Sequence, residues 1–175
     1  MEPLTARDAA RISDDVEAEA FVAMWEAAPP ALRERLGLRI APAVPAQAED
    51  VARVAVQSFE MPPFMVEWLQ QLRTGPWRMY AVTDGGAVVG GGCLYLRGPA
   101  AWLGVAAVAP SHRRRGGQGA LMARRIADAA AAGAVHIVTE TGEPTSAGEA
   151  NPSLANMRRC GFRTVASRLN YAAPA

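Results

Sequence analysis

The sequence predicts a fold of the α/β (α+β) class, in which helices flank a central sheet. Segments with helical spacing of apolar residues, such as 46–59, alternate with short apolar runs rich in valine and alanine, such as 101–109. Asp84-Gly85-Gly86 separates two strand-like runs and is a strong signal for a hairpin turn. At 175 residues and 50% hydrophobic content, the chain suits one domain with an ordinary core.

In the first half of this domain, the apolar spacing and the breaker residues set the elements. Val51, Val54 and Ala55 recur at helical spacing, and Met61-Pro62-Pro63 interrupts the chain after that helix. The predicted elements are, in order, a strand at 38–40, helices at 46–59 and 64–72, and strands at 77–83 and 87–96.

The second half begins with the apolar strand 101–109 and continues into a long helix. This helix is expected to turn Leu121, Met122 and Ile126 inward and to end at Gly133, where a glycine commonly closes a helix. The remaining predicted elements are a strand at 135–140, a short helix at 153–160 closed by Gly161, and a terminal hairpin at 162–171.

Residues 1–36 are expected to form a helical extension that precedes a domain spanning 37–175. Helical spacing in 14–28 ends at Pro29-Pro30, and a short helix follows at 31–36. The extension is predicted to pack on the edge of the domain. A dimer contact and a wall of the substrate site are the alternatives.

Composition excludes several classes of function. A formal net charge of +1 argues against a dedicated nucleic-acid binder despite the arginine triplet 113–115. Two isolated cysteines are too few for a disulfide scaffold or a zinc site, so no metal is expected. The absence of an apolar run near 18 residues and of a signal-peptide core predicts a soluble, cytoplasmic protein without a membrane partner. The chain is expected to act as a monomer or a homodimer.

A glycine-rich basic loop joins the strand 101–109 to the long helix and has the features of an anion site. The first turn of a helix presents free N–H groups and the positive end of the helix dipole. Gly116, Gly117 and Gly119 allow the backbone to approach a ligand closely, and the arginines 113–115 add charge suited to phosphate oxygens. The sequence therefore predicts that a phosphorylated ligand binds here.

Two common nucleotide motifs are excluded. A mononucleotide P-loop requires a lysine, and the chain contains none. The dinucleotide pattern G-x-G-x-x-G, with an acidic residue about twenty positions later, is not met by Gly90-Gly91-Gly92, which lies inside a strand-like run.

The loop instead resembles the pyrophosphate-binding motif of the GNAT acyltransferases, V-x-P-x-x-[QR]-x-x-G-x-[GA]. Val108, Pro110, Arg113 and Gly116 fall on this pattern, whereas Gln118 stands where the family usually has Gly or Ala. Read one residue later, Arg114, Gly117 and Gly119 satisfy the short core without the Val-Pro spacing. Residues 37–172 also follow the family's order of elements, and Gly161-Phe162 resembles the pair that follows its last helix.

This resemblance implies a mixed, mostly antiparallel sheet with a splayed strand pair, and an N-acetyltransferase that uses acetyl-CoA as co-substrate. The acceptor implied is a primary amine of a small molecule or a protein. By position in the motif, the residues expected to bind acetyl-CoA are Ala106, Ala107, Val108, Arg113, Arg114, Arg115, Gly116, Gly117, Gln118, Gly119 and Ala120, with Asn151 or Asn156 in place of a family asparagine whose position Ala150 holds.

The catalytic groups implied by the family are only partly present. Counting seven positions from Gly133 places Glu140 where one branch has its general base, and Glu143 is a possible substitute. Met157 replaces the tyrosine that serves many relatives as general acid, so thiolate departure is left to be assisted by water, by Ser153 or by no acid at all. A catalytically weak acyl-CoA-binding protein, acting as a sensor or assembly partner, is therefore the alternative function.

Two further features complete the predicted site. The spacing Ser153, Asn156, Arg159, Gly161 resembles a bacterial subgroup of the family, which Gln118 also fits. In the family, the region after the first helix forms one wall of the acceptor site. By this resemblance, an apolar or aromatic acceptor is expected to contact Met61, Phe64, Met65 and Trp68.

Overall fold

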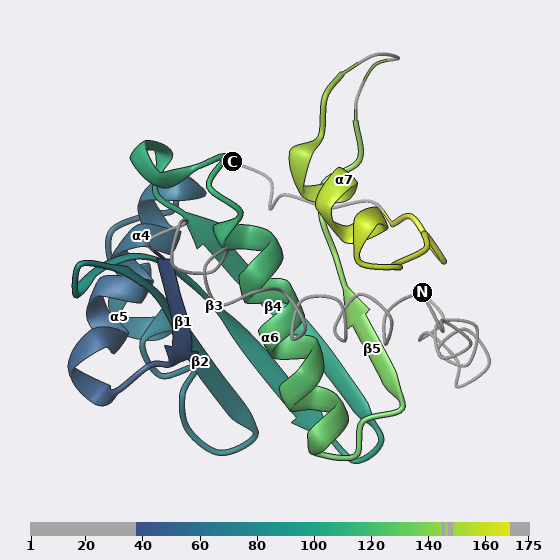
Figure 1. Ribbon diagram of the computed structural model, residues 1–175, viewed down its shortest axis with the longest axis horizontal. Coiled ribbons are helices and arrows are strands. Elements are labelled where there is room, and N and C mark those ends of the chain that lie inside the picture. The colour runs from purple at the N-terminus through teal and green to yellow at the C-terminus, as the bar shows by residue number, and fades with distance from the viewer. Residues whose placement is uncertain (1–37, 145, 147–148, 169–175) are drawn as a thin grey trace, which may run out of the picture.

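The computed structural model describes residues 38–144, 146 and 149–168 and contains a five-stranded mixed sheet of order β1-β2-β3-β4-β5 (Figure 1). Neighbouring strands are antiparallel except β4 and β5, which run parallel. The strands are β1 Leu38–Pro42, β2 Trp77–Asp84, β3 Ala87–Arg97, β4 Ala100–Val108 and β5 His136–Thr139. The predicted fold class is therefore confirmed.

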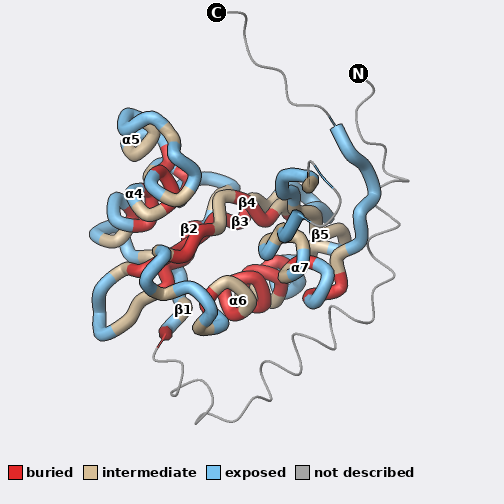
Figure 2. The backbone as a smooth tube through the Cα atoms, turned by 90° about the horizontal axis from the view of Figure 1, so that it is seen from above, coloured by how far each residue is buried: buried red, intermediate tan, exposed pale blue. Residues whose placement is uncertain are grey.

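Helices cover both faces of this sheet. A 3-10 turn η1 (Pro45–Gln47) leads into α4 (Ala48–Ser58), and α5 (Met65–Leu69) follows on the same side. The other side carries α6 (Gly117–Ala131), preceded by the 3-10 turn η2 (Pro110–His112), and α7 (Pro152–Arg159). Figure 2 shows the two pairs of helices on opposite sides of the strands.

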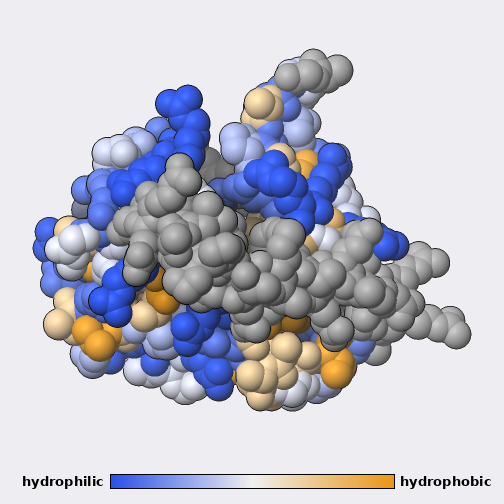
Figure 3. Space-filling model, in the orientation of Figure 1, coloured by the Kyte–Doolittle hydropathy of each residue, from blue (hydrophilic) through white to orange (hydrophobic). Residues whose placement is uncertain are grey.

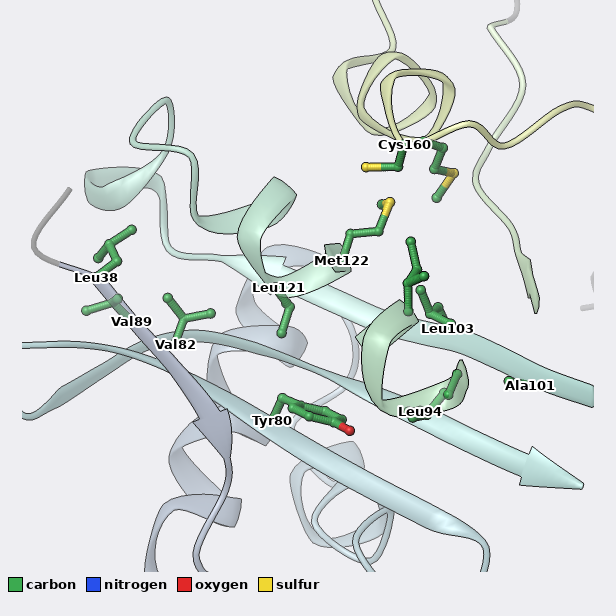
Figure 4. Close-up of a cluster of buried hydrophobic side chains, with 13 residues drawn as sticks. Leu38, Tyr80, Val82, Val89, Leu94, Ala101, Leu103, Leu121, Met122 and Cys160 are labelled. Atoms are coloured by element: carbon green, nitrogen blue, oxygen red, sulfur yellow. The ribbon is translucent and has the colours of Figure 1, made fainter. Parts of the chain in front are cut away.

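The core consists of two hydrophobic clusters, one on each side of the sheet. Figure 4 shows the cluster under α6, in which side chains of β1 to β4 meet Leu121 and Met122 of α6 and Cys160 after α7. Leu121, Met122 and Ile126 are buried, as the helical spacing predicts. The second cluster packs the buried face of α4, including Val51 and Ala55, against β2 and β3.

The glycine run in β3 has a packing reason. A Cβ added at Gly91 would lie 2.4 Å from the carbonyl oxygen of Tyr80 and 2.6 Å from the side chain of Val51. The strand therefore approaches both β2 and α4 too closely for any side chain at this position. This explains why Gly90-Gly91-Gly92 lies within a strand and forms no nucleotide loop.

Most predicted elements are confirmed within a few residues, with two differences. Helix α5 ends at Leu69, three residues before the predicted end at 72. Residues 162–168 form no strand, so the predicted hairpin 162–171 is wrong over its described part, and residues 169–171 lie outside it. Arg168 of this segment forms an ion pair with Glu140, the residue after β5, and such a side-chain contact sets up no ladder of backbone hydrogen bonds.

The predicted extension 1–36 lies outside the described residues, so its helices stay a prediction. Within the described part of the chain, no helix combines the length and apolar character needed to cross a bilayer.

Candidate functional site

The sheet opens between β4 and β5. Their parallel pairing runs from Ala100 opposite His136 to Leu103 opposite Thr139, and the hydroxyl of Thr139 donates to the carbonyl of Leu103 at 2.8 Å. Strand β4 continues to Val108, beyond the last paired residue. In the second half of β4, the edge on the side of β5 is therefore no longer paired with β5. The two strands form the splayed pair that the sequence resemblance implies.

The backbone of β4 directs amide groups toward this open edge. The N–H of Ala109 donates to the carbonyl of Val89 in β3 at 2.8 Å. Because N–H groups alternate along a strand, those of Val108 and Ala106 point away from β3, toward the open edge. The Nε of Arg113 donates to the carbonyl of Val108 at 3.3 Å and so holds the end of the strand.

A β-bulge lies halfway along β4. Gly91 pairs with Ala107 and Cys93 with Gly104, so the two residues Val105 and Ala106 oppose one residue of β3. Val105 has a φ of 49°, in the left-handed region that a β-branched residue rarely adopts. Such a conformation costs on the order of 1–3 kcal/mol and persists only where the surroundings impose it.

A fully buried arginine lies beneath the bulge. Arg125 is 1% exposed, and its Nη1 donates to the carbonyls of Cys93 at 3.0 Å and Gly104 at 3.2 Å. Its Nε donates to the carbonyl of Leu121 at 3.2 Å. Desolvation lowers the pKa of Arg125 to about 10, so the group stays charged at neutral pH. No sequence motif distinguishes this arginine from the others.

The N-terminus of α6 lies at the end of the basic loop and has free amides. Gly116 is the N-cap, with a φ of 75° and no side-chain cap, and the first helical bond runs from Ala120 N–H to Gly116 at 3.0 Å. The amides 117–119 therefore have no acceptor within the helix. A Cβ at Gly117 would face the core, 3.0 Å from Leu38, whereas a Cβ at Gly119 would meet nothing within 4 Å.

The basic loop is anchored to the β2–β3 hairpin by an aspartate. Asp84 accepts a hydrogen bond from Nη1 of Arg115 at 2.8 Å, and its carboxylate lies 3.4 Å from Nε2 of His112. Ser111 Oγ lies 2.8 Å from the other ring nitrogen of His112. Arg114 is exposed, with a φ of 61°. From the sequence, Asp84 is recognisable only as a turn residue, because its contact with Arg115 joins distant parts of the chain.

Gln118, the departure from the family motif, joins α6 to α7. Its Nε2 donates to Ser153 Oγ at 3.1 Å, and its Oε1 accepts from Asn156 Nδ2 at 2.5 Å. Asn156 Oδ1 in turn accepts from Arg159. We refer to Gln118, Ser153 and Asn156 as the Gln118 clasp.

Asn151 is the N-cap of α7. Its Oδ1 accepts from the N–H of Leu154 at 2.8 Å, and its Nδ2 donates to the carbonyl of Gly142 at 2.6 Å. Like Asn156, it therefore has protein partners, and the contact of either residue with acetyl-CoA stays a prediction.

Glu140 directly follows β5. In the parallel register, Val138 of β5 lies beside Trp102 of β4. Because side chains alternate between the two faces along a strand, Glu140 follows on the same face as Val138, opposite α6. Its carboxylate is exposed and forms an ion pair with the guanidinium of Arg168. Its assignment as general base stays a prediction, as does the substitute role of the exposed Glu143.

Aromatic side chains gather on this same face of the sheet. The ring centroids of Trp77 and Tyr95 are 4.8 Å apart, and those of Trp77 and Trp102 are 5.7 Å apart. At helix α5, the N-cap residue Phe64 is 71% exposed and Trp68 is 58% exposed. By contrast, Figure 3 shows hydrophilic residues gathered along the upper edge of the view, over the loop before α6 and over α7.

Comparisons with known proteins agree with this geometry. The sequence model of the acetyltransferase (GNAT) family matches residues 46–162, which is more than half of the chain. No curated protein sequence matches the chain significantly.

Solved structures of acetyltransferases share the fold. An aminoglycoside acetyltransferase from an uncultured soil metagenomic sample is 23% identical, with a TM-score of 0.63 over 79% of this chain and 98% of its own. A GCN5-related N-acetyltransferase from Ralstonia eutropha JMP134 is 22% identical, with a TM-score of 0.59 over 79% and 99%.

A third structure is that of AAC(6')-Iy in complex with a bisubstrate analogue of CoA. It is 17% identical, with a TM-score of 0.64 over 79% of this chain and 99% of its own. These three similarities show the fold alone, whereas the match to the family model is a similarity of sequence. The chain therefore belongs to the GNAT family and is an N-acetyltransferase.

Proposed function

We propose that the protein transfers an acetyl group from acetyl-CoA to a primary amine of a small molecule or a protein. The observation that carries this proposal is the open edge of β4, which begins where pairing with β5 ends after Leu103 and leads to the N-terminus of α6. An extended thioester co-substrate fits this arrangement, because one end of it is a diphosphate and the other an acyl group.

The residues present fit acetyl-CoA at both ends. The free amides 117–119 and the arginines 113–115 suit the diphosphate, since they combine backbone donors, the helix dipole and charge. The open side at Gly119 leaves room for the ligand. The outward amides of Ala106 and Val108 supply donors for the thioester oxygen.

The transfer is an aminolysis. The amine nitrogen bonds to the acetyl carbon, the C–S bond breaks, and the thiolate takes a proton from water. The proton lost by the amine passes to the Glu140 carboxylate, directly or through one water. Met157 is 8% exposed and packs in the core under α6, which supports a transfer without a side-chain acid at that position.

The acceptor is proposed to be an apolar or aromatic amine. The exposed rings of Phe64, the N-cap of α5, and of Trp68, together with the edge-to-face rings of Trp77 and Trp102, support this choice because they offer apolar contact area. Met61 and Met65, which were expected on the same wall, pack against the cluster of α4.

Thiol release from acetyl-CoA across a panel of amines tests the proposal, with the acetylated product identified by mass spectrometry. The panel pairs aromatic amines such as tyramine with polyamines such as spermidine at equal concentration. Transfer favouring the aromatic amines is expected. Saturable acetyl-CoA binding without transfer to any amine would instead favour the sensor function, with which the absent acid at Met157 and the ion pair of Glu140 also agree.

A further inference from the structure

Arg125 connects three elements where the bulge begins. The two carbonyls that its Nη1 binds belong to Cys93 and Gly104, which face each other across β3 and β4 immediately before the register shift. Its Nε bond to Leu121 fixes the side chain to α6. Among the described residues, all three of its hydrogen-bond acceptors are backbone carbonyls, and no carboxylate pairs with it.

The peptide that Arg125 holds is the one that sets the bulge. Gly104 O accepts the bond, and the N–H of the same peptide belongs to Val105, the residue with left-handed φ. From the other face, the ring of Trp102 covers Gly104, since a Cβ there would lie 2.3 Å from the ring. The Gly104–Val105 peptide is thus fixed between an arginine on one face and a tryptophan on the other.

We propose that Arg125 is a positioning residue of the transfer site, an inference that rests on the proposed function. By holding the Gly104–Val105 peptide, it fixes the bulge and aims the amides of Ala106 and Val108 at the thioester oxygen. Its charge lies in a water-excluded interior close to these amides. It therefore also favours the negative charge that develops on that oxygen during transfer.

A structural role alone would make different predictions. Buried carbonyls at a bulge require donors, and an arginine that did no more than supply them would affect folding stability but not the bound thioester. The discriminating quantity is the carbonyl stretching frequency of bound acetyl-CoA, measured by isotope-edited infrared difference spectroscopy with carbonyl-labelled acetyl-CoA. Stronger donation to the carbonyl lowers this frequency, and the measurement needs no acceptor.

The variants are Arg125→Met, which removes the donors and the charge, and Arg125→Lys, which keeps the charge but loses the planar guanidinium and its fixed set of donors. Arg124→Met is the matched control, because Arg124 is the neighbouring residue on α6 and its guanidinium is partly exposed beside Asp128. Gly92→Ala leaves Arg125 in place but introduces a Cβ 3.1 Å from its Nη1 and 3.2 Å from Ala106.

We expect wild type and Arg124→Met to lower the carbonyl frequency of bound acetyl-CoA below its value in water. Arg125→Met should raise it toward that value, with Arg125→Lys in between, while the Kd for acetyl-CoA stays within about threefold because the diphosphate contacts persist. With an acceptor in hand, kcat of Arg125→Met should fall about 100-fold at an unchanged KM for acetyl-CoA, as expected for misplaced donors.

An unchanged frequency in folded Arg125→Met would overturn the inference and leave the proposed function intact. The inference would also be overturned, with the proposed function intact, if wild type bound acetyl-CoA without lowering the carbonyl frequency. Wild type that fails to bind acetyl-CoA would refute the proposed function itself. If Arg125→Met does not fold, Arg125→Lys decides: a raised frequency supports the inference, and the wild-type value overturns it. Gly92→Ala, whose Cβ presses on both Nη1 of Arg125 and Ala106, should raise the frequency as well.

Discussion

Removing the Gln118 side chain should loosen helix α7 without removing the backbone amides of the basic loop. Gln118→Ala eliminates two half-buried hydrogen bonds, to Ser153 at 3.1 Å and to Asn156 at 2.5 Å. At about 1 kcal/mol for each bond, the free energy of unfolding should fall by about 2 kcal/mol. For a chain of this length, that corresponds to a loss of about 4–8 °C in Tm.

The assay is urea denaturation of the full chain, with thermal unfolding as a second readout. Gln57→Ala is the matched control, since Gln57 lies on an exposed position of α4. It should change the free energy of unfolding by no more than about 0.5 kcal/mol. The double variant with Asn156→Ala should show a coupling free energy of about 1 kcal/mol. Equal small effects of Gln118→Ala and Gln57→Ala would mean that the clasp does not stabilise α7.

Two other perturbations have defined outcomes. Glu140→Gln should lower the transfer rate by about 10²–10⁴ with unchanged acetyl-CoA affinity, whereas Glu143→Gln should act normally; normal turnover of Glu140→Gln would place the base elsewhere. Burial raises the pKa of Cys93 to about 12 and of Cys160 to about 11 from 9.0, so the unfolded chain releases protons that the folded chain keeps. The free energy of unfolding should therefore fall by about 2 kcal/mol between about pH 9 and pH 10, where the lowered pKa of Arg125 and the raised pKa of Tyr80 contribute smaller changes of opposite sign to one another. Urea titrations at both pH values measure this fall in the free energy of unfolding. Cys160→Ala should roughly halve it, and a stability independent of pH would contradict the burial of the two thiols.

The elements of the fold could be predicted because their signals are local. Apolar spacing determines which face of α6 is buried, and the turn at Asp84-Gly85-Gly86 determines the hairpin. The loop before α6 could also be predicted, since the helix start and the glycines are a contiguous motif. The segment 162–168 shows the limit, because its pattern is compatible with a strand but the structure gives it none, and the ion pair of Arg168 with Glu140 is a side-chain contact.

Features set by tertiary contacts could not be predicted. Arginine is rarely buried completely, so Arg125 was not distinguished from its partly exposed neighbour Arg124. A signal was present, because Arg125 lies four residues from both Leu121 and Ala129 on the buried stripe of α6. The left-handed Val105 has no such signal, since its conformation depends on contacts from other strands and from α6.

The most direct test of the acetyl-CoA assignment is a calorimetric titration of acetyl-CoA into wild type and Gly119→Glu. A side chain at Gly119 extends into open space at the first turn of α6, so the variant should fold. Ala130→Glu, which adds the same charge at the exposed far end of α6, is the control.

Saturable one-to-one binding is expected for wild type and Ala130→Glu. Gly119→Glu should weaken it at least about 100-fold, because a carboxylate then opposes two phosphate charges at close range. Unchanged affinity in folded Gly119→Glu, or no binding by wild type, would contradict the placement of the co-substrate at this helix.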